Sequence, residues 1–226
     1  MNKPTVVSIF SGGGGFDLGF HKSGYKIVLS TDNYKPAIET LQNNKLSENI
    51  LYSDIRNIDY KNFQNIDVLI GGPPCPPYSK SRFYLKNKSR ALNDENSFTL
   101  SEYIRGINQL KPKVFVFENV FGFVYKPHKN AFDLLKDSAE KLGYKLSYKV
   151  INCANYGIPQ TRERFFCIGV QKNLSKFVFP KETHSSKDKN LLPWVTAGEV
   201  LSDLDYPLPE DSDKQAGAKH KHLLKL

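Results

Sequence analysis

Cysteine is scarce in this chain of 226 residues, and long apolar runs are missing. The three cysteines, Cys75, Cys153 and Cys167, are an odd number without CxxC spacing. This pattern argues against a disulfide framework or a zinc site, and it fits a reducing cytoplasm. No apolar run reaches the roughly 18 residues that a membrane-spanning helix needs. The N-terminus also turns glycine-rich too early for a secretory signal.

Acidic residues are the minority, with 23 Asp and Glu against 32 Lys and Arg, which gives a net charge of +9. A basic balance favours a polyanionic partner, most often nucleic acid. The positive charge gathers in residues 80–90, which contain no acid, and in the tail at 214–225. Either run can be a solvated loop. The position of the first, directly after Cys75, favours a functional role.

Apolar runs rich in β-formers alternate with helical patterns along most of the chain. Strands are expected at 5–10, 25–31, 68–70, 114–118, 146–152 and 164–170, with a weaker one before Asp54. Helices are expected at 16–23, 36–44, 98–110 and 130–142. The alternation predicts an α/β fold with a doubly wound, mostly parallel sheet.

The pattern fades after about residue 175, where the sequence becomes polar. We therefore expect one domain over 1–175, followed over 176–226 by a linker or the opening of a further domain. Within that second part, only 195–204 has a helical pattern.

Cys75 lies between two Pro-Pro pairs in the run GGPPCPPYS at 71–79. Proline fixes φ and forces the preceding residue into extended geometry, so these pairs hold the thiol on a stiff loop. The preceding run at 67–72 is typical of a short buried strand that ends in glycines. A rigid thiol at a strand end suits an enzyme nucleophile. A cysteine in a structural loop is the alternative, and the local sequence leaves both open.

The run SIFSGGGGFDLGF at 8–20 predicts a strand, a glycine-rich turn and a helix start. Such a turn lets a ligand approach the backbone, and a nucleotide-type cofactor is the natural guest there. The dinucleotide fingerprint fails from Gly12, because its last position is Asp17. Asp32, at the end of the second strand, suits a ribose diol. These features favour S-adenosylmethionine over NAD; a structural turn with a solvated Asp is the alternative.

Four segments, in this order, resemble the sequence blocks of the catalytic portion of DNA (cytosine-5)-methyltransferases. They are FSGGGGF at 10–16, GGPPCPPYS at 71–79, FENV at 117–120 and NYGIPQTRERFF at 155–166. The resemblance implies the Rossmann-like fold of S-adenosylmethionine-dependent methyltransferases.

The resemblance also implies roles for individual residues. Cys75 corresponds to the nucleophile that attacks C6 of the target cytosine, and Glu118 to the group that contacts N3. Arg162 and Arg164 correspond to residues at the base and its flanking backbone. Residues implied in DNA binding are Ser79, Lys80, Arg82, Asn119 and Gln160. Residues implied in binding S-adenosylmethionine are Phe10, Ser11, Gly12, Gly14, Gly15, Phe16, Asp32, Asp54, Ile55 and Pro74. No metal is expected.

This chemistry explains the residue types. Cytosine C5 is a poor nucleophile, and addition of a thiolate at C6 makes it enamine-like, which is covalent catalysis. N3 must then be protonated or hydrogen-bonded, and a partly buried Glu118 with a raised pKa suits that task. The base must leave the stack to react, and residues 80–90 would contact nearby phosphates. The sequence identifies no base for the C5 proton, and water can take that role.

The chain departs from the family pattern at several positions. Ser8 stands where Asp is common, Pro76 replaces Gln, and Tyr78 replaces Phe. Asn33 falls where an aromatic residue often stacks on adenine, and Asn96 near a position often occupied by Arg.

The resemblance implies methyl transfer to C5 of cytosine in duplex DNA, as the modification enzyme or a subunit of a bacterial restriction-modification system. Such an enzyme works in the cytoplasm on nucleoid DNA. The family's target-recognition region and closing blocks are not recognised. Two explanations stay open: the chain is one subunit of a split enzyme whose second polypeptide carries the recognition region, or it is a truncated product. In both cases we expect weak activity from this chain alone. The alternatives are a transfer-RNA cytosine-C5 methyltransferase and a non-catalytic cofactor-binding remnant.

Overall fold

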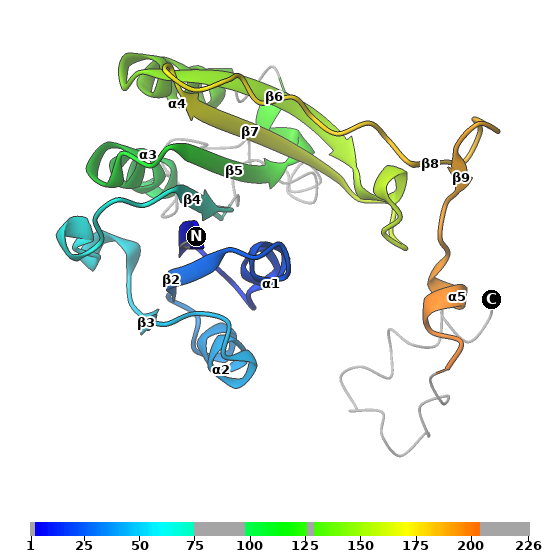
Figure 1. Ribbon diagram of the computed structural model, residues 1–226, viewed down its shortest axis with the longest axis horizontal. Helices are drawn as coiled ribbons and strands as arrows, with labels where there is room; N and C mark the ends of the chain where they lie inside the picture. Colours follow the sequence, from blue (N-terminus) through cyan, green and yellow to red (C-terminus); the bar gives the residue numbers. More distant parts are fainter. Residues whose placement is uncertain (1–2, 75–97, 126–128, 204–226) are drawn as a thin grey trace, which may run out of the picture.

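The computed structural model describes residues 3–74, 98–125 and 129–203, and its centre is a twisted seven-stranded sheet (Figure 1). The strand order is β3-β2-β1-β4-β5-β7-β6. Strands β1 to β5 pair in parallel, and β7 is antiparallel to both of its neighbours, β5 and β6. The bounds are β1 Thr5–Ile9, β2 Lys26–Asp32, β3 Ile50–Tyr52, β4 Val68–Gly71, β5 Val114–Val120, β6 Tyr144–Asn152 and β7 Glu163–Gln171. This confirms the predicted doubly wound, mostly parallel sheet.

Helices connect the strands as the periodicity predicts. The α-helices are α1 Gly15–Lys22, α2 Lys35–Asn44, α3 Phe98–Leu110, α4 Lys129–Lys141 and α5 Ala197–Val200. Short 3-10 helices are η1 Ile55–Asn57, η2 Tyr60–Asn62, η5 Phe121–Val124 and η7 Cys153–Tyr156. The first four α-helices lie within about one residue of their expected bounds, whereas the expected helix at 195–204 is reduced to α5. Among the described residues, no helix is long and apolar enough to cross a bilayer.

The two faces of the sheet bury alternate residues of the same strands. Val7 and Leu69 belong to the larger apolar cluster, which α3 and α4 cover. Val6 and Ile70 belong to a smaller cluster on the other face, against which Phe16 of α1 packs. Successive side chains of a strand point to opposite faces, so a strand buried on both sides reads as a continuous apolar run. This explains the unbroken VLI run at 68–70.

Aromatic rings fill the larger cluster near β5 and β7. Tyr103 of α3 packs edge-on against Phe117, with ring centroids 5.1 Å apart. Phe123 stacks on Phe165 at 5.6 Å, and Phe117 lies 5.1 Å from Phe123. Such ring pairs add to the stabilisation from area burial. Cys167 is also fully buried here, as a small member of the core.

The segment after β7 follows strand β6 before it reaches the short sheet formed by β8 (His184–Ser185) and β9 (Leu192–Pro193) (Figure 1). The Ser147 hydroxyl on β6 donates to the Phe177 carbonyl at 2.6 Å. The Lys149 ammonium lies 3.4 Å from the Glu182 carboxylate. The first residues of the expected linker therefore contact the main sheet. The predicted division of the chain near residue 175 stays a prediction.

Candidate active site

Glu118 lies near the carboxyl end of β5, and the antiparallel pairing of β5 with β7 brings Arg164 beside it. Glu118 pairs with Phe166 and Val120 with Arg164 in this register. The Arg164 Nε atom lies 2.9 Å from Glu118 Oε1, and both side chains are at most one quarter exposed. Two residues that are 46 positions apart in the sequence thus form one partly buried ion pair.

Burial raises the pKa of Glu118 above its ordinary value. The positive charges of Arg164 and Arg162, and the hydrogen bond from Arg164, act in the opposite direction, but the desolvation is larger. A carboxyl group with a raised pKa holds a proton at higher pH than a solvated one, and it can donate that proton to a ring nitrogen. Burial thus supplies the raised pKa that the predicted role requires, and the role itself stays a prediction.

The backbone that leads to Cys75 is held beside Glu118. The Asn119 amide donates to the Pro73 carbonyl at 3.3 Å, and the Thr99 hydroxyl donates to the Pro74 carbonyl at 3.4 Å. A Cβ atom on Gly72 would lie 2.9 Å from Glu118 Oε2, so the carboxylate approaches a position that only glycine leaves open. Contacts from β5 and α3 therefore fix the chain up to the residue before Cys75.

Four predicted site residues lie outside the described residues: Cys75, Ser79, Lys80 and Arg82. Two others, Gln160 and Arg162, are exposed on the segment between η7 and β7. The backbone N–H of Arg162 donates to Asn152 Oδ1 at 3.2 Å, which anchors that segment at the end of β6. Asn119 is buried, and the described contact of its amide nitrogen is with Pro73. DNA binding by Asn119 and Gln160 stays a prediction.

The glycine-rich loop joins β1 to α1 with an unusual backbone. Phe10 has φ +53°, Gly12 has φ +53° and Gly14 has φ +85°. A bulky residue with positive φ is strained, and such strain gathers at functional sites. The Gly12 N–H donates to Asp32 Oδ2 at 2.8 Å, and the Thr31 N–H donates to Ser11 Oγ at 3.1 Å. These bonds tie the loop to the carboxyl end of β2.

Asp17 is wholly buried beneath this loop. Its carboxylate accepts hydrogen bonds from the hydroxyls of Ser30 and of Ser8, the latter at 2.9 Å. Desolvation raises the pKa of Asp17. Ser8, a departure from the family pattern, is therefore a donor to a carboxylate that comes from α1. In the sequence, Asp17 stands out only as the residue that breaks the dinucleotide fingerprint, and the helical spacing gives no sign of its burial.

A cavity that is partly open to solvent lies at the carboxyl ends of β1 and β2, with about 410 Å³ of empty space when the solvent at its mouth is included. Its lining residues are Phe10, Thr31, Asp32, Asn33, Ser53, Asp54, Ile55, Pro74, Phe98 and Thr99. Five of them are predicted cofactor residues: Phe10, Asp32, Asp54, Ile55 and Pro74. The other five predicted residues lie in the loop or first turn next to it: Ser11, Gly12, Gly14, Gly15 and Phe16.

The lining of the cavity fits an adenosine-type group. Apolar surface from Phe10, Ile55 and Phe98 suits a purine ring, and the Asp32 carboxylate suits ribose hydroxyls. Asn33, at the position where an aromatic residue often stacks on adenine in the family, lines the cavity. The side chain of the neighbouring Tyr34 is 64% exposed. Phe98 and Thr99 were missed as cavity residues, because the sequence marks them only as the start of a helical stripe.

Asp54 closes one side of the cavity and is paired with Arg56. The guanidinium contacts both carboxylate oxygens, at 3.0 Å and 2.5 Å. The hydrogen bonds from Arg56 lower the pKa of Asp54 to about 2. Within the described ranges, no group of three His, Cys, Asp or Glu side chains is arranged to hold a metal ion.

The family model of C-5 cytosine-specific DNA methylases matches residues 4–223. Among curated proteins, the type II methyltransferase M.NgoFVII of Neisseria gonorrhoeae is 33% identical, over 100% of this chain and 60% of its own length. M.SacI of Streptomyces achromogenes is 32% identical, over 88% of this chain and 57% of its own. The chain thus spans under two thirds of the length of these relatives. M.AquIA of a Picosynechococcus strain is 30% identical over 90% of each chain.

Solved structures agree on the fold. The Entamoeba histolytica methyltransferase EhMeth matches 99% of this chain and 67% of its own, with a TM-score of 0.66 at 20% identity. The Dnmt2 methyltransferase of S. pombe matches 78% of this chain and 52% of its own, with a TM-score of 0.59 at 18% identity. The match of the family model over nearly the whole sequence shows that this chain belongs to the C-5 cytosine-specific DNA methylase family.

Proposed function

We propose that this chain carries the catalytic domain for transfer of a methyl group from S-adenosylmethionine to C5 of cytosine in duplex DNA. The observation that carries the proposal is the position of Glu118. Its pKa is raised, Arg164 orients it at 2.9 Å, and its carboxylate lies against Gly72, three residues before Cys75. The cavity that suits an adenosine group includes Pro74 in its lining, so both reactants would meet at this loop.

In the proposed reaction, the Cys75 thiolate adds to C6 of a cytosine that has left the helix. Glu118, protonated, gives its proton or a hydrogen bond to N3, which takes up the charge that the addition places on the ring. S-adenosylmethionine, which Asp32, Asp54 and Ile55 would hold in the cavity, would supply the methyl group for C5 in electrophilic form, with S-adenosylhomocysteine as the product. A water molecule then takes the C5 proton as the C6–sulfur bond breaks and the Cys75 thiolate leaves, and Glu118 recovers the proton from N3.

The Arg164 guanidinium has two effects on this carboxyl group. It fixes the rotamer of Glu118 through the 2.9 Å contact, and its charge opposes the rise in pKa that burial causes. Because burial and the arginine charge act on the pKa of Glu118 in opposite directions, we propose that this one group both donates a proton to N3 and recovers it, as general acid-base catalysis requires.

We further propose that the protein acts in the bacterial cytoplasm, on nucleoid DNA, within a restriction-modification system. The type II methyltransferases among its relatives support this setting. Choice of the DNA sequence would come from a second polypeptide that carries the target-recognition region. The match covers 90% of this chain and 90% of M.AquIA, so a type II methyltransferase chain of similar length is known.

The test is covalent trapping on DNA. A duplex with 5-fluorocytosine blocks loss of the C5 substituent, so the thiol stays attached after methyl transfer. We expect an adduct, seen by mass spectrometry, that needs both S-adenosylmethionine and Cys75. The Cys75→Ser variant should form none, and Cys153→Ser, a matched change at the half-buried Cys153, should retain it.

The same experiment separates the competing functions. An adduct on a 5-fluorocytosine transfer RNA, with none on duplex DNA, would replace the proposal with the RNA methyltransferase. Absence of an adduct on either polymer at saturating concentrations, with S-adenosylhomocysteine still bound, would support the non-catalytic remnant. Robust sequence-specific methylation by the single chain would contradict the need for a second polypeptide.

A further inference from the structure

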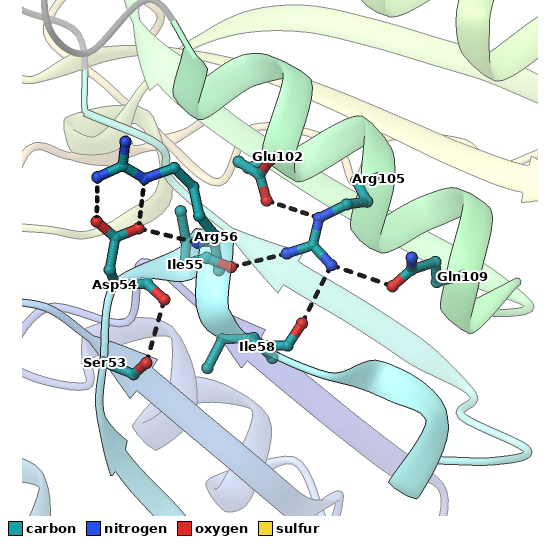
Figure 2. Close-up of polar contacts among 8 residues, drawn as sticks. All are labelled: Ser53, Asp54, Ile55, Arg56, Ile58, Glu102, Arg105 and Gln109. Carbon is teal, nitrogen blue, oxygen red and sulfur yellow. Dashed lines mark hydrogen bonds and ion pairs between the residues drawn. The ribbon is translucent and has the colours of Figure 1, made fainter.

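Arg105 of α3 binds the backbone of η1 through its guanidinium group (Figure 2). The Nη2 atom donates to the Ile55 carbonyl at 2.7 Å, and Nη1 donates to the Ile58 carbonyl at 3.1 Å. Two further donors of the guanidinium are also used, since Nε donates to Glu102 Oε2 at 2.7 Å and Nη1 donates to Gln109 Oε1 at 3.1 Å. The carboxylate of Glu102 balances the charge of the guanidinium.

The segment that Arg105 holds is short, and few bonds of its own support it. The Asn57 N–H donates to the Asp54 carbonyl at 3.0 Å, and the Asp54 carboxylate caps the Arg56 N–H at 2.9 Å. η1 spans three residues, Ile55–Asn57, and 3-10 helices of this length have few hydrogen bonds of poor geometry. The η1 backbone bond from the Ile58 N–H to the Ile55 carbonyl is 3.3 Å long. Hydrogen bonds from a charged donor are about twice as strong as neutral ones, so the contacts from Arg105 are a large part of what fixes this turn.

A second contact joins η1 to the first turn of α3. The Arg56 guanidinium lies 4.5 Å from the ring centroid of Phe98. It also contacts the Asp54 carboxylate, and Figure 2 shows this second contact. Asp54, Ile55 and Phe98 all line the cavity. Two walls of the cavity, which come from segments about 40 residues apart, are therefore joined behind the lining by two arginines.

We propose that Arg105 is a positioning residue for the cofactor: by fastening η1 to α3, it sets the distance between the Asp54–Ile55 wall and the Phe98–Thr99 wall. The role rests on the proposed function, because it presumes that S-adenosylmethionine occupies the cavity. Arg105 itself is not a lining residue, so it acts through the carbonyls that it holds. A lysine has the charge but lacks the planar fork that reaches two carbonyls together.

The experiment compares Arg105→Gln and Arg105→Lys with Lys113→Gln. The control, Lys113→Gln, also removes one positive charge, here from the 2.7 Å ion pair between Lys113 and Asp67. That pair lies at the amino ends of β4 and β5, at the sheet edge opposite the cavity. The first measurement is hydrogen exchange of residues 54–58 in the protein without ligand. The second is calorimetric titration with S-adenosylhomocysteine.

We expect exchange in 54–58 to accelerate roughly tenfold or more in Arg105→Gln, since each charged hydrogen bond contributes well over RT. Affinity for S-adenosylhomocysteine should fall by roughly the same factor. Arg105→Lys should lie between this variant and the wild type, and Lys113→Gln should match the wild type in both measurements. If Arg105→Gln does not fold, Arg105→Lys alone carries the comparison.

Wild-type affinity in an Arg105 variant whose 54–58 exchange is fast would overturn this role and leave the proposed function intact. Unchanged exchange in both Arg105 variants would do the same. If the wild-type chain itself has no affinity for S-adenosylhomocysteine, the proposed cofactor site is wrong, and the role of Arg105 falls with it.

Discussion

Three glycine-to-alanine substitutions have different consequences because the new methyl group meets different surroundings. On Gly71, the Cβ atom would lie 2.6 Å from the Ile9 carbonyl oxygen, about 0.8 Å short of ordinary contact. On Gly72, it would lie 2.9 Å from Glu118 Oε2. On Gly19, an exposed helical position, it would meet nothing within 4 Å. One chemical change thus probes a rigid backbone, a catalytic side chain and open space.

The expected free energies of unfolding follow from these contacts. Gly71 pairs with Ile9 in the β1–β4 ladder, so neither backbone can move alone. Gly71→Ala should cost about 3 kcal/mol, the upper end for overpacking. The Glu118 carboxylate can rotate away from a methyl on Gly72, so Gly72→Ala should cost about 1 kcal/mol. Gly19→Ala should stabilise by about 0.5–1 kcal/mol, because glycine is a poor helix residue.

The effect on the rate of adduct formation should be larger for Gly72→Ala than for Gly71→Ala, although Gly71→Ala loses more stability. Gly72→Ala displaces the Glu118 carboxylate from its 2.9 Å contact with Arg164, so the rate of Cys75 adduct formation on the 5-fluorocytosine duplex should fall roughly tenfold or more. Denaturant unfolding and adduct kinetics on all three variants provide the two measurements. The reasoning is refuted if Gly72→Ala loses stability without losing rate, or if Gly71→Ala unfolds within about 0.5 kcal/mol of the wild type.

Three further predictions concern buried groups. The raised pKa of Asp17 gives a stabilisation that is full below its unfolded pKa, near 3.8, and is lost as pH rises through the folded value. Asp17→Asn should therefore gain stability relative to the wild type between pH 4 and 8 in urea unfolding, and a constant difference would contradict this. Phe165→Ala removes a ring that is 1% exposed and packed on Phe123, and it should cost about 3–5 kcal/mol in the same assay; a loss below about 1 kcal/mol would show that the cluster tolerates the void. Asn119→Ala removes the donor to the Pro73 carbonyl, so it should slow Cys75 adduct formation on the 5-fluorocytosine duplex, as Gly72→Ala does. Wild-type adduct kinetics in this variant would exclude a positioning role for Asn119.

Local pattern alone was enough to locate most elements. Runs of three to nine residues that are rich in β-formers mark the strands, and stripes such as that of α3 mark the helices, because burial imposes these periods directly on the sequence. The weak strand before Asp54 is present as β3. The expected helix at 195–204 was too long, since a helical pattern without a buried face does not hold a helix beyond its capping box at Thr196 and Glu199.

The strand order and the direction of β7 depend on pairings between distant segments, which no local pattern records. The antiparallel insertion of β7 between β5 and β6 is what places Arg164 beside Glu118. The sequence contained both residues and suggested their roles through family resemblance. Their contact, and the burial that raises the pKa of Glu118, come from the fold.

Residues that do not line the cavity but hold the segments around it gave the least signal in the sequence. Arg105 occupies an ordinary place in the helical pattern of α3, and Asp17 has the position of a solvated acid in a first helical turn. In the structure, Arg105 binds two carbonyls of η1, and Asp17 is buried between two serine hydroxyls.

The sequence by itself determined the element types, the glycine-rich loop and the four blocks that identify the family, because these depend on residue chemistry and short spacing. Only the tertiary structure decided which charges are buried together, which glycines must stay glycine, and which segments form the walls of the cavity. Those properties depend on distances between atoms that are far apart along the chain, and packing alone sets such distances.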